Sequence, residues 1–327
     1  MHRKSEVRHN ERPPFQPAWW LPGGDSQTLW PALFRLRPRL PVHRQRFVLP
    51  DDDWIDLFWG PSRDSALVLI LHGLGGCATA CYALGMLKAL TQHGLQGVIM
   101  EYRGAGSTPN RCDRFYHAGA WQDLQAVVQE LHTRYPRRRI GVVGFSLGAS
   151  ILLNWLIADP TAPVDAAVAV SVPFDLAACA HLLNQGFARI YQWDLLRHLK
   201  QLLLRKYAGR HGTSISIQVV NLIRTLHEFD DHITAPLHGY ANAADYYRRC
   251  SCGPHLKTIQ HATLIIHARD DPFVPLSSIP PMQDFSSRTQ FELTRTGGHV
   301  GFVQGPWPWQ ANYWIERRVT DYFLSMF

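Results

Sequence analysis

The feature that most constrains this chain is the pentapeptide Gly144-Phe145-Ser146-Leu147-Gly148, which lies between an apolar β-like run and an apolar helical run. Residues 139–143 form a short run, rich in β-branched side chains and uncharged after the first residue, as in a buried strand. Residues 150–156 carry apolar side chains at helical spacing. A Gly-x-Ser-x-Gly between a strand and a helix is typical of a nucleophile elbow, where glycines permit a strained turn. The helix N-terminus favours a developing oxyanion nearby. The pattern therefore predicts that Ser146 is a nucleophile.

Strands and helices alternate along the chain, which predicts an α/β fold with a mostly parallel central sheet flanked by helices. Residues 66–71 are almost continuously apolar, as in a strand buried on both faces. We expect an N-terminal arm over residues 1–65, packed on the core, and one α/β domain over residues 66–327. Further strands are expected at 45–49, 54–59, 97–102, 165–171, 263–267 and 290–293, and helices at 79–93, 118–135 and 309–326.

One stretch interrupts the alternation of strands and helices. From about residue 175 to residue 240 the sequence has a helical pattern with no strand inserted. An ordinary crossover between neighbouring strands is shorter than this. We interpret the stretch as a helical cap over the site, inserted into the α/β domain.

The cap contains the acidic run Glu228-Phe229-Asp230-Asp231, which could suggest a metal site. Carboxylates in such a segment pair more often with basic side chains on the protein itself. Here the available partners are Arg224, Arg248 and Arg249. We therefore expect ion pairs that fix the cap on the body, and no metal.

A glycine-rich turn, His72-Gly73-Leu74-Gly75-Gly76, follows the buried strand at 66–71. Such a turn brings a backbone N–H close to the nucleophile, and together with the amide of Leu147 it forms an oxyanion hole. Leu74 is the expected donor, since the glycines on either side give the turn its freedom. The alternatives are a plain strand-to-helix turn and a phosphate-binding loop. The segment lacks the Gly-Lys-Ser/Thr ending that a phosphate-binding loop needs.

A nucleophilic serine needs a base and an acid, and both are expected after late strands. Asp270 and Asp271 both follow the strand at 263–267, and we favour Asp271 because it stands four residues before Pro275 in an Asp-x-x-x-Pro turn. Asp270 would then bond the local backbone, and Asp175 is a more distant candidate. His299 lies between glycines after the last strand, which completes the order serine, aspartate, histidine.

Composition narrows the class of protein. The chain has 327 residues, of which 46% are hydrophobic and 18% charged, so a large folded core is expected. The net charge of +7 is dispersed and not interleaved with aromatic residues as in nucleic-acid modules, so we expect at most weak attraction to anionic surfaces. Neither a signal peptide nor a membrane span is evident. The six cysteines show no metal-ligand spacing, which indicates reduced thiols in the cytoplasm.

Taken together, these motifs resemble those of the YheT-like branch of the α/β-hydrolases, the AB hydrolase 4 family with its eukaryotic ABHD-type relatives. The resemblance implies a serine esterase acting on short-chain or acylglycerol-like carboxylic esters, without metal or organic cofactor. It also implies the triad Ser146, Asp271 and His299. Besides the elbow and the glycine turn, the resemblance rests on Gln27-Thr28, Tyr102-Arg103-Gly104, Pro109-Asn110-Arg111, Tyr116-His117-Ala118-Gly119, Asp123, the cap run 228–231, Tyr246-Tyr247, Asp270-Asp271-Pro272-Phe273 and His299-Val300-Gly301-Phe302.

The expected ligand is therefore a small ester or lipid. Three alternatives remain open at this point. The same triad can transfer the acyl group to an alcohol or amine, it can cleave thioesters, or the fold can serve as a non-catalytic binding protein. We expect Tyr116-His117 to support or pack against the triad without joining it.

Overall fold

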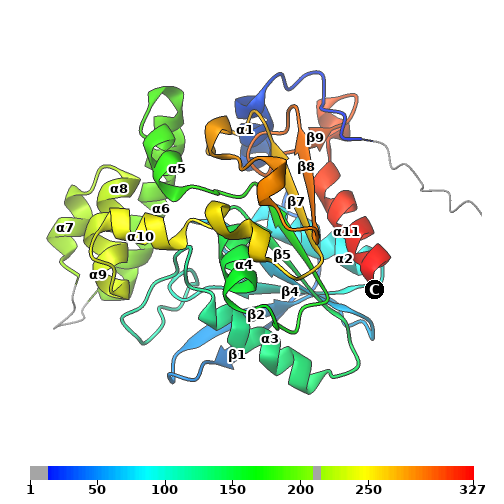
Figure 1. The fold of residues 1–327 in the computed structure, drawn as a ribbon, viewed down its shortest axis with the longest axis horizontal. Helices are drawn as coiled ribbons and strands as arrows, with labels where there is room; N and C mark the ends of the chain where they lie inside the picture. Colours follow the sequence, from blue (N-terminus) through cyan, green and yellow to red (C-terminus); the bar gives the residue numbers. More distant parts are fainter. Residues whose placement is uncertain (1–13, 209–214) are drawn as a thin grey trace, which may run out of the picture.

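The computed structural model describes residues 14–208 and 215–327, which are built around an eight-stranded sheet (Figure 1). The strand order is β1-β2-β4-β3-β5-β6-β7-β8. β1 pairs antiparallel with β2, β2 pairs antiparallel with β4, and all the other pairs are parallel. The strands are β1 (His43–Val48), β2 (Trp54–Trp59), β3 (Leu67–Leu71), β4 (Gln96–Glu101), β5 (Ile140–Phe145), β6 (Ala166–Val170), β7 (Thr263–Ala268) and β8 (Thr289–Thr294). The predicted α/β fold with a mostly parallel sheet is confirmed.

The central strands β3, β4, β5, β6 and β7 are buried at every position, because helices cover both faces of a parallel sheet. Their register determines what meets at the carboxyl edge. Leu71 at the end of β3 pairs with Gly144 of β5, and Phe145 pairs with Val170 of β6. The turns that follow these strands therefore emerge side by side.

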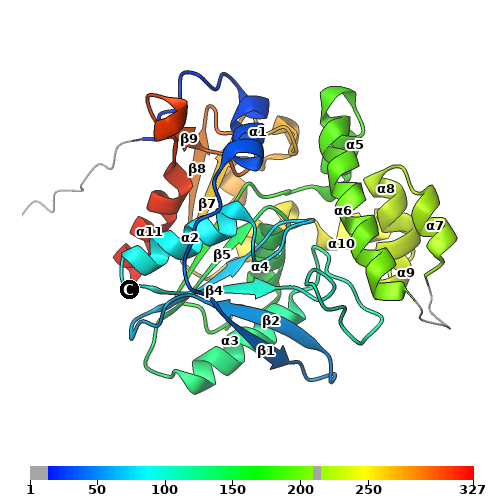
Figure 2. The ribbon, with the colours of Figure 1, turned by 180° about the vertical axis from the view of Figure 1, so that it is seen from behind.

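Helices flank the sheet on both faces. On one face lie α2 (Cys81–Gln92) and α11 (Trp314–Met326), and on the other lie α3 (Gln122–Arg134) and α4 (Leu147–Ala158) (Figures 1 and 2). Alternate residues of β3 serve the two layers: Leu69 packs in the α3/α4 core, whereas Ile70 packs in the α2/α11 core. Helix α4, which follows the elbow, is buried around most of its circumference, with Trp155 fully enclosed.

Between β6 and β7 the described chain is helical, and these helices form a lobe beside the sheet (Figure 1). The insertion expected over 175–240 continues further, to residue 258. Asn242 caps the N-terminus of the last α-helix of this insertion, α10, by accepting a hydrogen bond from the Asp245 amide. The sequence prediction overlooked this helix start. The elements are α5 (Leu176–Leu183), α6 (Arg189–Tyr207), α7 (Ile217–Leu222), α8 (Leu226–Phe229), a π-helical turn (Asp230–Thr234), α9 (Ala235–His238), α10 (Ala243–Cys250) and a 3-10 helix (Gly253–Thr258).

The N-terminal arm contains a helix, α1 (Gly24–Phe34), which is absent from the helices expected from the sequence. Two glycines at its start and Pro31 inside it hid the helical pattern. The side-chain amide of Gln27 anchors α1 to the C-terminal part of the chain, since it both donates to and accepts from the backbone of Val303. Long-range contacts therefore stabilise a helix with weak intrinsic propensity.

The C-terminal helix begins at Trp314, five residues later than expected. Pro306 and Pro308 interrupt the apolar pattern there, and the chain instead forms a 3-10 turn (Pro308–Gln310) and a two-stranded ribbon of β9 (Val303–Gln304) and β10 (Asn312–Tyr313). Within residues 14–208 and 215–327, none of the helices has both the length and the apolar character needed to cross a bilayer.

Candidate active site

Ser146 stands at the turn between β5 and α4 with φ 53° and ψ −118°, a region that non-glycine residues rarely adopt. Its amide donates to the Val170 carbonyl at 2.9 Å, which holds the turn against β6. A Cβ on Gly144 would lie 2.4 Å from the carbonyl oxygen of Gly148, and a Cβ on Gly148 would lie 2.6 Å from that of Leu71. Both flanking positions therefore require glycine for steric reasons.

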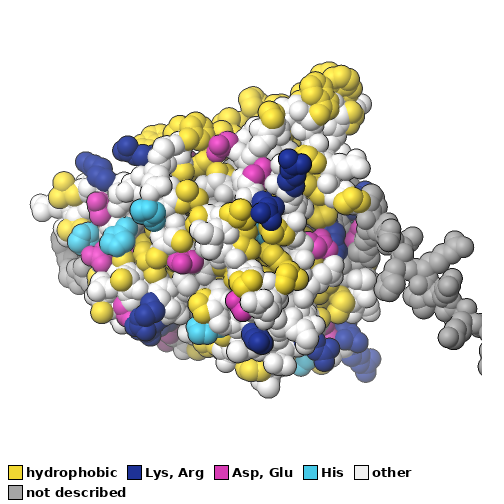
Figure 3. Space-filling view, turned by 45° about the horizontal axis from the view of Figure 1, so that its top comes forward, with side chains coloured by type: hydrophobic (Ala, Val, Ile, Leu, Met, Phe, Trp, Pro, Cys, Tyr) yellow, Lys and Arg dark blue, Asp and Glu magenta, His cyan; other side chains and the backbone are white. Residues whose placement is uncertain are grey.

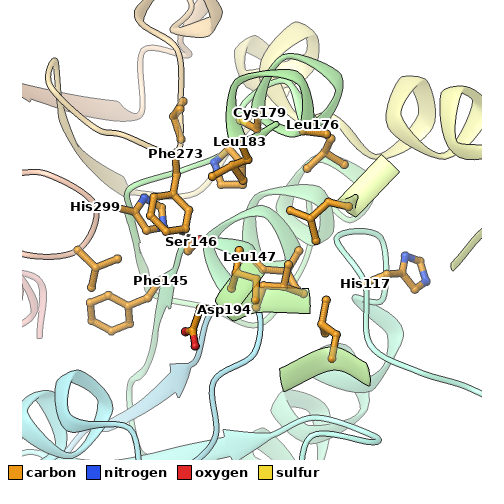
Figure 4. Close-up of a pocket in the computed structure, with 18 of the residues that line it drawn as sticks. His117, Phe145, Ser146, Leu147, Leu176, Cys179, Leu183, Asp194, Phe273 and His299 are labelled. Carbon is orange, nitrogen blue, oxygen red and sulfur yellow. Dashed lines mark hydrogen bonds between the residues drawn. The ribbon is translucent and has the colours of Figure 1, made fainter. Parts of the chain in front are cut away.

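His299 and Asp271 extend a line of hydrogen bonds from this serine. Figure 4 shows His299 beside Ser146. His299 Nε2 lies 2.8 Å from Ser146 Oγ, and Nδ1 lies 2.9 Å from Asp271 Oδ2. A neutral imidazole with its proton on Nδ1 donates to the carboxylate and accepts from the serine hydroxyl. Burial acts to raise the pKa of Asp271, but the neighbouring His299 outweighs it and holds that pKa below its usual range. The carboxylate therefore stays ionised behind the imidazole.

The two other candidate acids have different partners. Asp270 Oδ1 accepts a hydrogen bond from the Gly298 amide at 3.0 Å, as a turn residue would. Asp175 caps α5 by accepting from the amide three residues later. Of the three aspartates considered, Asp271 is the one whose carboxylate contacts His299.

Two neighbours fix the position of His299, and the sequence reasoning gave neither a role. Thr28 on α1 accepts the His299 amide at its Oγ1 at 2.8 Å, and the same hydroxyl donates to the Gly24 carbonyl. Phe273 stacks on the imidazole, with ring centroids 4.1 Å apart and planes 10° from parallel. The only sequence signal for these residues was their place in the motifs of the resemblance.

The glycine-rich turn after β3 leaves one amide unused. The Gly73 N–H donates to the Tyr82 hydroxyl at 2.8 Å, and the Gly75 N–H donates to the Tyr116 hydroxyl at 2.9 Å. Between them, the Leu74 N–H has no acceptor in the part of the chain that the structure describes. Backbone N–H groups near a protein interior normally have a hydrogen-bond acceptor. An N–H group without one can therefore donate a hydrogen bond to a ligand. Tyr116 supports the turn, in line with its expected secondary role.

The amide of Leu147 is the second free donor. It is the first of α4, where a helix leaves its N–H groups without intrahelical partners, and no oxygen among the described residues accepts it. The turn that carries Leu74 lies against Ser146, since a Cβ on the preceding Gly73 would be 3.2 Å from the Cβ of Ser146, and Leu147 directly follows Ser146 in the chain. The turn and the helix start therefore face the serine together.

A cavity of about 440 Å³ contains Ser146 and His299 in its wall and reaches into the helical insertion. Its size falls in the range of small-molecule sites, which are typically apolar with a few polar groups. Figure 4 shows aliphatic side chains from α5 and α4 around the serine, with Phe273 beside His299. The apolar lining includes Pro31, Ala32, Leu74, Leu147, Leu176, Leu183, Leu195, Leu199 and Leu226.

Two carboxylates also line this cavity, Asp194 of α6 and Asp230 of the π-helical turn, and Asp230 is the more deeply buried. The two oxygens of Asp230 accept hydrogen bonds from Thr234 Oγ1 at 2.7 Å and from the Tyr247 hydroxyl at 2.8 Å. Burial raises the pKa of this carboxyl group to about 6. The cavity therefore carries a titratable group in the helical insertion, separate from the Ser146 end.

The expectation that the acidic run pairs with arginines is wrong for the contacts that the structure describes. Arg248 and Arg249 instead pair with Asp245, three and four residues earlier on α10, because side chains at this spacing share a helix face. Glu228 accepts a hydrogen bond from the backbone amide of Arg224, not from its guanidinium. The carboxylates of the run accept hydrogen bonds from backbone amides and hydroxyl groups of the helical insertion.

No three side chains of histidine, cysteine, aspartate or glutamate converge as metal ligands within the two described ranges. The six cysteines are free thiols. The polar groups around the cavity therefore include the line from Ser146 to Asp271, the two backbone amides and the carboxylates Asp194 and Asp230.

Comparison with known proteins is consistent with this geometry. Residues 66–306 match the family described as alpha/beta hydrolase fold. YheT of Escherichia coli (strain K12), which carries an esterase name, is 40% identical over 305 residues, or 91% of this chain and 89% of that protein. The mouse protein named phospholipase ABHD3 is 29% identical, over 95% of this chain and 78% of its own length. The yeast protein named monoacylglycerol lipase is 30% identical, over 80% of this chain and 59% of its own length.

Among solved structures, the Pyrococcus furiosus esterase Pf2001 superposes with a TM-score of 0.57 at 18% identity, covering 96% of this chain and 99% of that one. At this identity the similarity establishes the fold alone. The match of the family over most of the chain, together with the identity to YheT, establishes the kinship. This chain belongs to the α/β-hydrolase family, in its YheT branch.

Proposed function

We propose that this protein is a serine esterase that hydrolyses carboxylic esters through Ser146, His299 and Asp271. The observation that carries the proposal is the continuous line of hydrogen bonds from Ser146 Oγ through the imidazole to a buried carboxylate, inside an apolar cavity. The same arrangement of groups performs acyl transfer on several unrelated folds. Relatives named esterase, phospholipase and monoacylglycerol lipase support a hydrolase of this kind.

In the first step, Ser146 Oγ attacks the ester carbonyl carbon while His299 Nε2 takes the serine proton. The carbonyl oxygen becomes an oxyanion, which the amides of Leu74 and Leu147 stabilise. Asp271 keeps the imidazole in the required tautomer and stabilises the imidazolium. When the tetrahedral intermediate collapses, His299 returns its proton to the leaving alcohol, and the acyl group remains on Ser146.

In the second step, water enters, and His299 takes one of its protons as the water oxygen attacks the acyl carbon. The oxyanion forms and collapses again, the bond between the acyl carbon and Oγ breaks, and the proton passes to Ser146. The carboxylic acid then leaves. Each proton moves among Ser146, His299, substrate and water, so the cycle balances without an organic cofactor or a metal.

We propose further that the helices between β6 and β7 act as a cap that receives the acyl chain. Leu176 and Leu183 of α5 and Leu199 of α6 line the cavity above the serine, so an aliphatic chain would be surrounded by apolar side chains. Burial of each methylene contributes roughly 0.8 kcal/mol, which favours longer chains until the cavity is filled. The substrates expected are esters of apolar acids, including acylglycerol-like lipids.

A fluorophosphonate probe tests the proposal, because only an activated serine forms a phosphonate ester with loss of fluoride. We expect wild-type protein to be labelled once per chain, with the label on Ser146 by peptide mass spectrometry. Ser146→Ala protein is the control and should remain unlabelled. Folded wild-type protein that resists the probe would refute the catalytic role and favour a binding protein that keeps the fold.

A further inference from the structure

A continuous row of aromatic side chains runs along one end of the molecule. Trp309 stacks on Trp307, which contacts Trp19 edge to face at 5.7 Å. The row continues from the adjacent Trp20, whose ring lies 4.7 Å from that of Trp30. Trp30 in turn contacts Phe34. We call these residues the aromatic ridge; it comprises Trp19, Trp20, Trp30, Phe34, Trp307 and Trp309.

Four of the six ridge residues are exposed, whereas Trp20 and Trp30 are half-buried. Trp309 is 78% exposed, Trp19 70% and Phe34 61%, and Leu33 beside Phe34 on α1 is 68% exposed. Single exposed apolar residues are normal on a protein surface, but a contiguous exposed patch marks an interaction site. The tryptophan rings are held in place, since Trp19 Nε1 donates to the Pro306 carbonyl at 2.9 Å.

A second exposed apolar group lies at the start of α6. Phe187, Ile190 and Trp193 are each more than half exposed, with Trp193 at 64%. Tyr191 beside them donates to Asp25 of α1 at 2.7 Å, so α6 and α1 are tied together. Figures 1 and 2 show the turn between α5 and α6, helix α1 and the loop after β9 at the same upper end of the molecule. With that end tilted forward, hydrophobic side chains gather along its upper edge (Figure 3).

The same two helices line the catalytic cavity. Pro31 and Ala32 of α1 and Asp194 and Leu195 of α6 form part of its wall. Exposed apolar groups therefore stand on the outer faces of the helices that flank the cavity on two sides. A surface that binds both groups would receive the cavity between them.

Exposed arginines outnumber the carboxylates on and beside these elements, where Asp25 accepts from Tyr191 and Asp194 pairs with Arg197. Arg189 is exposed at the first position of α6, between Phe187 and Ile190, and Arg37 and Arg39 are exposed just after α1. The chain as a whole carries a net charge of +7. Amphipathic tryptophan rings beside arginines are suited to the boundary between lipid headgroups and acyl chains. A partner that suits these residues has a negatively charged surface with an apolar layer beneath it.

We propose that the aromatic ridge and the start of α6 dock on the surface of an anionic lipid bilayer, with the catalytic cavity facing the membrane. Docking in this way would let an acylated lipid pass from the bilayer into the cavity without crossing water. This benefit rests on the proposed ester hydrolysis, whereas the docking itself does not. The protein then lies on the membrane and is held by side chains of α1, α6 and the loop after β9.

Vesicle co-sedimentation of the full chain tests the docking surface. Vesicles of phosphatidylcholine with phosphatidylglycerol are compared with vesicles of phosphatidylcholine alone. The double variant Trp193→Ser/Trp309→Ser removes one exposed ring from each apolar group. Leu222→Ser is the matched control, because Leu222 is 71% exposed on α7, away from the ridge. Arg189→Gln tests the charge.

We expect wild type and Leu222→Ser to bind the anionic vesicles equally and the double variant to bind at least about tenfold more weakly. Arg189→Gln should weaken binding about fivefold, and added salt should weaken binding by the wild type. Equal binding by the double variant and Leu222→Ser, or equal wild-type binding to neutral and anionic vesicles, would overturn the proposal. So would a dimer in solution that the double variant dissociates, since the ridge would then join two copies of the chain.

The outcome is separable from that of the esterase proposal. Trp193→Ser/Trp309→Ser and Arg189→Gln should hydrolyse a soluble short-chain ester at the wild-type rate, because the replaced side chains do not line the cavity. Ser146→Ala should bind anionic vesicles like the wild type while losing hydrolysis. Loss of vesicle binding in Ser146→Ala would contradict the docking surface, whereas retained hydrolysis in that variant would contradict the esterase proposal alone.

Discussion

Replacement of Asp230 by asparagine should change how the stability of this protein depends on pH. The carboxyl group is buried between Thr234 and Tyr247 in the cavity wall, and its pKa rises from an ordinary 3.8 to about 6. The folded state therefore holds this proton more tightly than the unfolded state. Stability from this group is fully present below pH 3.8 and is lost as the pH rises through about 6.

The size of the effect follows from the shift in pKa. Ionisation of this carboxyl group destabilises the folded state by about 3 kcal/mol at pH 8 and by about 2 kcal/mol at pH 5. Asparagine has nearly the same shape and does not ionise, and both hydroxyl partners can still bond it. The free energy of unfolding of Asp230→Asn, relative to wild type, should therefore increase by about 1 kcal/mol between pH 5 and pH 8.

Urea unfolding of both proteins at the two pH values measures this difference directly. Asp231→Asn, at the adjacent residue outside the cavity lining, controls for a general effect of replacing aspartate. A relative stability of Asp230→Asn that stays constant from pH 5 to pH 8 would refute the reasoning, because the carboxyl group would then titrate alike in the folded and unfolded states.

Two further predictions concern the placement of the imidazole. Asp271→Asn should lower kcat for a p-nitrophenyl ester by about ten-thousandfold, because the amide favours the tautomer of His299 that cannot accept the serine proton. Asp270→Asn keeps an oxygen for the Gly298 amide and should stay near wild type; the reverse result would exchange the roles of the two aspartates. Thr28→Ala leaves the His299 amide without its acceptor and should lower kcat about tenfold with little change in KM. Thr28→Ser should recover most of the rate, and failure of that rescue would show that the hydroxyl does not position the histidine.

The line of hydrogen bonds from Ser146 to Asp271 could be predicted from the sequence because its members belong to local motifs with strict steric demands. The contacts that a Cβ would make at Gly144 and Gly148 show why only glycine fits at the elbow. Leu74 could be proposed as a donor because the glycines around it predict a turn next to Ser146. In each case a short segment determines its own backbone, and the order of parallel strands then brings the segments to one edge.

The missed features depend on partners far away in the sequence. Helix α1 contains Pro31 and is held by the pairing of Gln27 with Val303, so its own residues give little sign of it. The role of Thr28 likewise follows from a contact with His299, 271 residues away. The acidic run was paired with the wrong groups because its partners are hydroxyls and backbone amides, which leave no charge pattern in a sequence.

The central claim of this account is that Ser146 is the nucleophile of an ester hydrolase. The most direct measurement is kcat/KM of purified wild type and Ser146→Ala for p-nitrophenyl butyrate, with folding checked by circular dichroism. Ser150→Ala, one turn further along α4 and outside the cavity lining, is the matched control and should keep its activity. We predict that Ser146→Ala loses about ten-thousandfold or more in kcat/KM. Hydrolysis at the wild-type rate by Ser146→Ala would contradict the claim.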